Sequence, residues 1–164
     1  MRLILKKLTA VALGLGMILG GLGAAQAATA TGNMAVTATV AGACTVTGST
    51  LAFGAYVSAA VEAATTMTVN CTTSTPYTIA LNAGAGTGAT TTVRKMMSGA
   101  NILNYAVFRD AARTLNWGIV TGTDTVAGTG TGANQTVDVY GRVTAGQTVA
   151  AGSYSDTVGI TLTF

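Results

Sequence analysis

Short runs of alternating apolar and polar residues recur along the chain, and this period-two pattern constrains the fold more than any other feature. The alternating runs lie at residues 34–40, 44–46, 51–53, 67–71, 77–81, 137–143 and 158–164, and residues 102–108 are apolar on both sides except for Asn104. Successive side chains of a β-strand point to opposite faces, so each run would place one apolar face on a core. The pattern predicts an all-β protein.

Turn-forming residues separate these runs at regular intervals. Residues 82–86 and 98–101 are predicted to form hairpin or loop connections, and the Gly/Thr-rich residues 121–135 a long surface loop. Helix is expected to be limited to a turn near residues 110–113. Short strands at such spacing, rich in Thr and Val, are typical of a β-sandwich.

The first 27 residues have the composition of a secretory signal peptide. Arg2, Lys6 and Lys7 precede an apolar, glycine-containing stretch, and Ala25 and Ala27 supply the small residues of a cleavage site. The stretch is too short and too rich in glycine for a membrane span, so no stable membrane insertion is expected after cleavage. We therefore predict a signal peptide at residues 1–27 and export from the cytoplasm.

Removing this leader changes the electrostatic balance of the chain. The full sequence carries eight basic and five acidic residues, and three of the basic ones lie in the leader, which leaves a net charge of zero. A neutral chain lacks the basic patch that nucleic-acid binding requires, so no nucleic-acid partner is expected. So few charges also oppose association only weakly, which suits a protein that assembles with copies of itself.

The reactive residues argue against an enzyme. The chain contains no histidine, which removes the commonest general base and most catalytic zinc sites. The five acidic residues are scattered, and no metal or other cofactor is predicted. Cys44 and Cys71 are the only cysteines, and in an exported chain one such pair indicates a disulfide rather than a metal site.

Two further features have a structural and a functional interpretation. The charged residues 109–113 could bind a ligand, but a turn in which Asp110 bonds the backbone or Arg113 is favoured. Trp117 could stack on a sugar, but packing inside the sandwich is favoured. The structural interpretation is preferred in both cases.

The two ends of the mature chain carry the sharpest hypothesis. Residues 34–40 form an alternating strand after a small, polar lead, and the alternating residues 158–164 lack a proline or charge that would protect a strand edge. Such strands can extend the sheet of another copy, where main-chain bonds supply affinity and alternate side chains supply register. Pairing of residues 34–40 within their own sheet is the alternative.

The chain resembles the spore coat protein U-like family, which includes subunits of archaic chaperone–usher pili. The resemblance is carried by residues 32–40, 44–46, 51–56, 67–71, 104–113, 117–118 and 151–164. The most specific parts are Tyr-x-x-x-Arg-Asp-Ala-x-Arg, from Tyr105 to Arg113, and the ending that contains Tyr154-x-Asp156. The resemblance as a whole covers nearly all of the mature chain.

The resemblance implies an incomplete immunoglobulin-like β-sandwich that is completed by a donor strand. A periplasmic chaperone would lend a strand first, and at an outer-membrane usher the N-terminal segment of another pilin subunit would replace it. The implied organisation is a donor-strand segment at residues 28–43 and a pilin domain at residues 44–164. The candidate donor side chains are Met34, Val36, Ala38 and Val40; the acceptor and chaperone-facing strand carries Val158, Ile160, Leu162 and Phe164; and Cys44 and Cys71 form the implied disulfide.

Three functions are therefore weighed. The favoured one is a structural subunit of a cell-surface fimbria that supports adhesion and biofilm formation. The second is a secreted spore-coat or matrix protein of the same fold. The third is a self-complete carbohydrate-binding β-sandwich, with Trp117, Tyr105 and Tyr140 as its first candidate residues.

Overall fold

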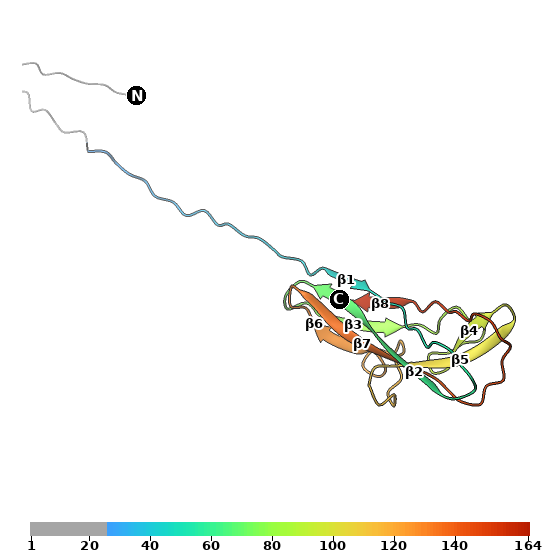
Figure 1. Ribbon diagram of the computed structural model, residues 1–164. Helices are drawn as coiled ribbons and strands as arrows, with labels where there is room; N and C mark the ends of the chain where they lie inside the picture. Colours follow the sequence, from blue (N-terminus) through green and yellow to red (C-terminus); the bar gives the residue numbers. More distant parts are fainter. Residues whose placement is uncertain (1–25) are drawn as a thin grey trace, which may run out of the picture. The chain divides into compact units, whose positions relative to one another are not determined.

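The computed structural model describes residues 26–164, and the predicted signal peptide lies almost entirely outside them (Figure 1). The described part contains eight β-strands and no α-helix. The strands are β1 (Cys44–Thr47), β2 (Val61–Cys71), β3 (Pro76–Leu81), β4 (Arg94–Ser98), β5 (Asn101–Phe108), β6 (Val126–Thr129), β7 (Asn134–Val143) and β8 (Ile160–Thr163). The prediction of an all-β protein is confirmed. Within residues 26–164 no helix is long and apolar enough to cross a membrane.

The strands form two sheets, as expected of a sandwich. One sheet has the order β1-β2-β7-β5-β4 and the other β6-β3-β8, and every pairing is antiparallel. The longest ladder joins β2 to β7, from the pair Val61 and Val143 to the pair Asn70 and Asn134. Along β2 the odd-numbered residues face inward and the even-numbered ones face outward, which is the period-two alternation of the sequence.

The core lies between the sheets and contains apolar side chains of both. Trp117 is fully buried, and its indole nitrogen donates a hydrogen bond of 3.0 Å to the Ile79 carbonyl. Cys44 and Cys71 form the predicted disulfide, which ties β1 to the end of β2. The prediction that Trp117 packs inside the sandwich is confirmed.

The charged residues after β5 form a turn, as predicted. The Asp110 carboxylate accepts hydrogen bonds from the backbone N–H groups of Thr114 and Leu115 and from the Thr114 hydroxyl. Arg113 does not pair with Asp110 through its side chain but forms an ion pair of 3.0 Å with Glu62.

Some predicted elements differ from the observed ones. Residues 121–135 were predicted as one loop, but they contain β6 and the start of β7, because β6 pairs with β3 despite its Gly/Thr-rich sequence. Residues 51–53 form no strand, since neither sheet offers them a partner in the described chain. β4 was not predicted, because its sequence does not alternate between apolar and polar residues.

The described chain divides into two units, one that ends at Ala38 and one of Thr39–Phe164. Within the first unit, residues 26–38 form no strand or helix, and Figure 1 draws them as an extended trace. The second unit contains all eight strands. Its chain is anchored from Ala43 onward, because Thr72 bonds the amide and the carbonyl of Ala43.

Candidate functional site

A groove with a mainly apolar lining opens between the two sheets. It has a volume of about 1030 Å³, at the upper limit of the roughly 300–1,000 Å³ common for small-molecule pockets. Two segments outside the strands flank it: wall 1, residues 48–56, and wall 2, residues 149–158. Its floor is made by inward-facing side chains of β2, β4, β5 and β7, including Met67, Met96, Leu103, Tyr105, Val139 and Val143. The groove is a gap in the core of the sandwich.

Wall 1 is held by its side chains alone. Leu51 and Phe53 pack over Gly141 of β7, where an added β-carbon would lie 2.7 Å from either side chain. Within the described chain, no backbone N–H or C=O of residues 48–56 pairs with another backbone group. Its nine residues therefore offer unpaired backbone donors and acceptors, which pairing with an added strand requires.

Wall 2 is fixed at a few points. Ser155 exchanges two backbone hydrogen bonds with Met97 of β4, of 2.8 and 3.1 Å. Tyr56, the last residue of wall 1, bonds the loop that precedes wall 2, because its hydroxyl donates to the Thr144 carbonyl and accepts from the Gln147 amide. Gly48, the first residue of wall 1, lies close to β8, because a β-carbon there would lie 2.7 Å from the Ile160 side chain. Both ends of wall 1 therefore contact residues that flank wall 2 in the sequence.

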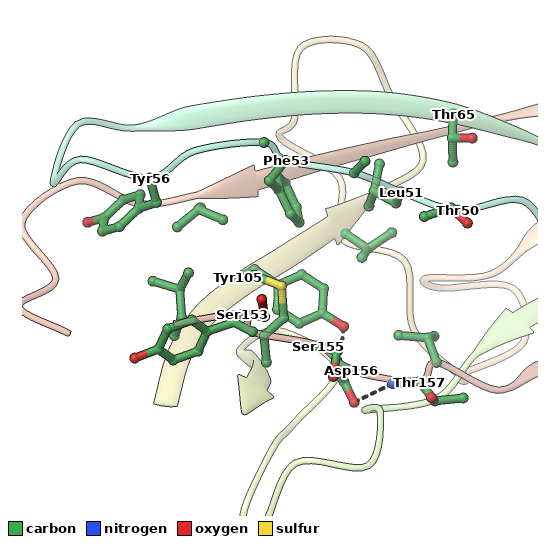
Figure 2. A pocket seen from close by; sticks show the side chains of 18 of the residues that line it. Thr50, Leu51, Phe53, Tyr56, Thr65, Tyr105, Ser153, Ser155, Asp156 and Thr157 are labelled. Carbon is green, nitrogen blue, oxygen red and sulfur yellow. Dashed lines mark hydrogen bonds between the residues drawn. The ribbon is translucent and has the colours of Figure 1, made fainter. Parts of the chain in front are cut away.

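Tyr105 and Asp156 form a polar contact inside this mainly apolar groove. The Tyr105 hydroxyl donates a hydrogen bond of 2.6 Å to Asp156 Oδ2, shown as a dashed line in Figure 2. Burial, together with the hydrogen bond and the negative charge of Asp156, raises the pKa of Tyr105 above its usual value. The tyrosine therefore stays neutral and remains a donor to the carboxylate.

Arg94 lies beside this contact and is completely buried. Its guanidinium donates to the carbonyls of Leu81, Asn82, Thr91 and Trp117, over 2.7–3.1 Å. Burial lowers its pKa, whereas Tyr105, Asp156 and Asp124 act in the opposite direction. Four backbone carbonyls thus surround the buried Arg94 guanidinium, which links β3, the loop before β4 and the segment that contains Trp117.

The predicted acceptor residues have different positions. Val158 and Ile160 line the groove, and Leu162 packs against the core next to it. Phe164 is 59% exposed and lines a separate shallow concavity with Thr75 and Pro76. The structure therefore brings two of the four side chains to the groove, and the roles of all four stay predictions.

The predicted donor side chains are exposed. Met34, Val36 and Val40 are 80–84% exposed, and residues 34–40 form no strand in the described chain. Pairing within their own sheet, the alternative considered from the sequence, does not occur in this structure. Their role as donors stays a prediction.

The structure does not present the aromatic residues considered for sugar binding as a surface patch. Trp117 is fully buried and Tyr105 is 6% exposed. Tyr140 is half-buried, and the guanidinium of Arg113 lies 5.7 Å from its ring centre. Within residues 26–164 no group of three or more potential metal-ligating side chains occurs.

Sequence reasoning missed most of the groove. Leu51 and Phe53 were assigned to a strand, and the contacts of Tyr56, Tyr105 and Arg94 in and beside the groove were not predicted. The alternation of Leu51 and Phe53 was the available signal, but a pattern identifies an inward face and not the absence of a partner.

Comparisons with known proteins agree with this architecture. The family model described as the Spore Coat Protein U domain matches residues 30–161, which include the predicted donor residues. The chain is similar to "Protein U" of Myxococcus xanthus, with 37% identity over 158 residues, 85% of this chain and 88% of the relative. The resemblance stated from the sequence is confirmed.

A solved structure shares the fold. It is the CsuC–CsuE chaperone–tip adhesion subunit pre-assembly complex from archaic chaperone–usher Csu pili of Acinetobacter baumannii. The match has a TM-score of 0.57 and 24% sequence identity, and it covers 77% of this chain but only 40% of that chain. The immunoglobulin-like sandwich predicted from the sequence agrees with this likeness.

Proposed function

Because the chain belongs to the Spore Coat Protein U domain family, we propose that it is a structural subunit of an extracellular fibre. In this proposal, residues 28–43 of one copy supply a strand that fills the groove of another copy. The observation that carries it is the groove itself, an apolar gap in the core beside nine residues of unpaired backbone. Such a gap exposes apolar surface that an added strand would remove from water.

The donor segment is short enough to lie along wall 1. From residue 34 to residue 40 an extended chain spans about 20 Å, and wall 1 would span about 26 Å at the same rise of about 3.3 Å per residue. Met34, Val36, Ala38 and Val40 would face the floor, whereas the residues between them, Ala35, Thr37 and Thr39, would face water. A one-residue slip would turn the threonines inward, so the apolar pattern itself selects the register.

The connection to the domain favours insertion into a different copy. Ala43 is bonded to Thr72 through both its amide and its carbonyl, so only residues 41 and 42 separate Val40 from a fixed point. To enter its own groove the segment would have to reverse direction within that distance. A segment-to-groove contact between copies does not close on itself, and its repetition produces a filament.

The remaining partners follow from the proposed route. An exposed apolar groove needs protection before assembly, which a periplasmic chaperone would provide by lending a strand. The similar solved structure is a complex of a chaperone with a pilus subunit. We extend the proposal to an outer-membrane usher, to a location on the cell surface, and to a role in adhesion and biofilm formation. No catalytic role is proposed.

The test is a comparison of unboiled and boiled surface material from cells that express the chain with its neighbouring genes. A ladder that survives detergent and collapses on boiling supports the proposal, because a deeply inserted strand dissociates slowly. Deletion of residues 28–40 should remove the ladder. A single monomer band in both lanes, from folded and exported protein, would refute the proposal.

A coat or matrix protein is the second candidate, since the family is described as the Spore Coat Protein U domain. This function needs the same fold but no fibre. Electron microscopy of the sheared material separates the two candidates, because strand exchange should give thin filaments and a coat should give sheets or amorphous layers.

A further inference from the structure

The two walls of the groove come from opposite ends of the domain sequence, and one floor residue contacts both of them between the groove's ends. The ring of Tyr105 meets the ring of Phe53 of wall 1 edge-on, with 5.8 Å between the ring centres. Its hydroxyl donates to Asp156 of wall 2 at 2.6 Å. Figure 2 shows Phe53 and Asp156 on either side of Tyr105.

Asp156 is held firmly on its own side. Its Oδ1 accepts 2.7 Å hydrogen bonds from the amides of Ala85 and Thr157. Ser155, the preceding residue, is paired with Met97 of β4. The carboxylate therefore has a fixed position, and Tyr105 links that position to the floor of the groove.

We infer that Tyr105 is a positioning residue that sets the separation of the two walls for the incoming strand. The inference rests on the proposed function. An inserted strand must lie about 4.7–4.9 Å from each neighbour for its backbone hydrogen bonds to form. These bonds weaken steeply when the geometry departs from its narrow range.

Wall 1 has no backbone hydrogen bonds of its own in the described chain, so side-chain contacts such as Phe53 on Tyr105 fix its position. A change at Tyr105 can therefore move either wall. The contact also joins the two most specific segments of the family resemblance, since Tyr105 begins the first one and Asp156 lies in the second. The hydrogen bond between Tyr105 and Asp156 is a physical reason for the two segments to occur together.

The test uses assembled polymers of the exported chain and a fluorescein-labelled peptide of residues 28–43. The measured quantity is the rate at which the peptide displaces the bound donor strand. Tyr105→Phe keeps the contact with Phe53 and removes only the hydroxyl, and Asp156→Asn weakens the same bond from the other side. Each should accelerate displacement about tenfold, the effect of losing one hydrogen bond to a charged acceptor.

The double variant distinguishes positioning through one bond from two independent effects. It should exchange no faster than the faster single variant, because both changes act on the same bond. Tyr140→Phe is the matched control, since the Tyr140 hydroxyl donates to the Asp138 carboxylate on the outward face of β7, away from the groove lining, and its loss should leave the rate unchanged. Trp117→Phe is the stability control, which should lower the urea midpoint without changing the displacement rate.

Displacement at the wild-type rate in Tyr105→Phe, or fully multiplicative effects in the double variant, would overturn the inference. If Tyr105→Phe is not exported, Asp156→Asn decides by the same criterion. A wild-type chain that forms no polymer refutes the proposed function before any variant is compared, so the two failures are distinguishable.

Discussion

A single charge placed on either face of the donor segment tests both the insertion and its register. Val36 is 80% exposed in the chain alone and would become buried on insertion. Its neighbour Thr37 would face outward in the same register. Val36→Asp and Thr37→Asp add the same charge one residue apart, so each variant is the control of the other.

The expected cost differs greatly between the two positions. Burial of a valine side chain contributes about 1.5–3 kcal/mol, and an ionised carboxylate in an apolar groove costs several kcal/mol more. A combined loss of at least about 5 kcal/mol weakens insertion by more than about 1,000-fold. A charge at an exposed position usually changes stability by no more than about 0.5 kcal/mol.

The assay is the fraction of exported protein that migrates as a ladder without boiling. We expect Val36→Asp to abolish the ladder and Thr37→Asp to preserve it, with equal export of both variants. The opposite result would show that the register is shifted by one residue. Wild-type ladders from both variants would refute the reasoning that this segment is the donor.

Three further predictions concern the stability of the domain. Replacing Cys44 and Cys71 by serine should lower the free energy of unfolding by about 3.5 kcal/mol in the chain-entropy model. Urea denaturation with and without reductant measures this, and equal midpoints for the wild type and the serine variant would contradict it. Arg94→Met should lower the free energy of unfolding by about 2–6 kcal/mol, because two buried carbonyls lose their donor at about 1–3 kcal/mol each, and an unchanged urea midpoint would contradict it. At Asp110 the hydrogen bonds of the turn outweigh desolvation, so the pKa of this carboxyl is lower in the folded state than in the unfolded state. The stabilisation from this shift is complete above the unfolded-state pKa and is lost as the pH falls through the folded-state pKa. Asp110→Asn should therefore flatten this acidic part of the pH profile of the thermal midpoint.

The sequence predicted those parts of the fold that are determined by which face of a strand is apolar and buried. β2, β3, β5 and β7 were recognised because their inward side chains are apolar. Trp117 and the Asp110 turn were interpreted correctly from residue type and context. A strand pattern reports which face is buried, and for these elements that was sufficient.

The missed parts depend on partners that lie far away in the sequence. β4 is stabilised in part by Arg94, a buried cation whose acceptors are carbonyls, and carbonyls leave no trace in a sequence. β6 exists because β3 offers it an edge, although its Gly/Thr-rich sequence is typical of a loop. The contact between Tyr105 and Asp156 spans 51 residues and joins two segments that gave no sign of touching.

The two alternating segments that form no strand have a common explanation. Residues 34–40 and residues 51–53 both carry the strand pattern, and neither is paired in the described chain. An apolar stripe costs solubility unless it is buried, so unpaired strand patterns are expected where the missing partner belongs to another molecule. Residues 34–40 have an apolar stripe that packs on no core, and residues 51–53 border a gap in the core that an added strand would fill. Insertion of residues 34–40 of one copy into the groove of another would bury the stripe and fill the gap. The two aspartate variants test this complementarity.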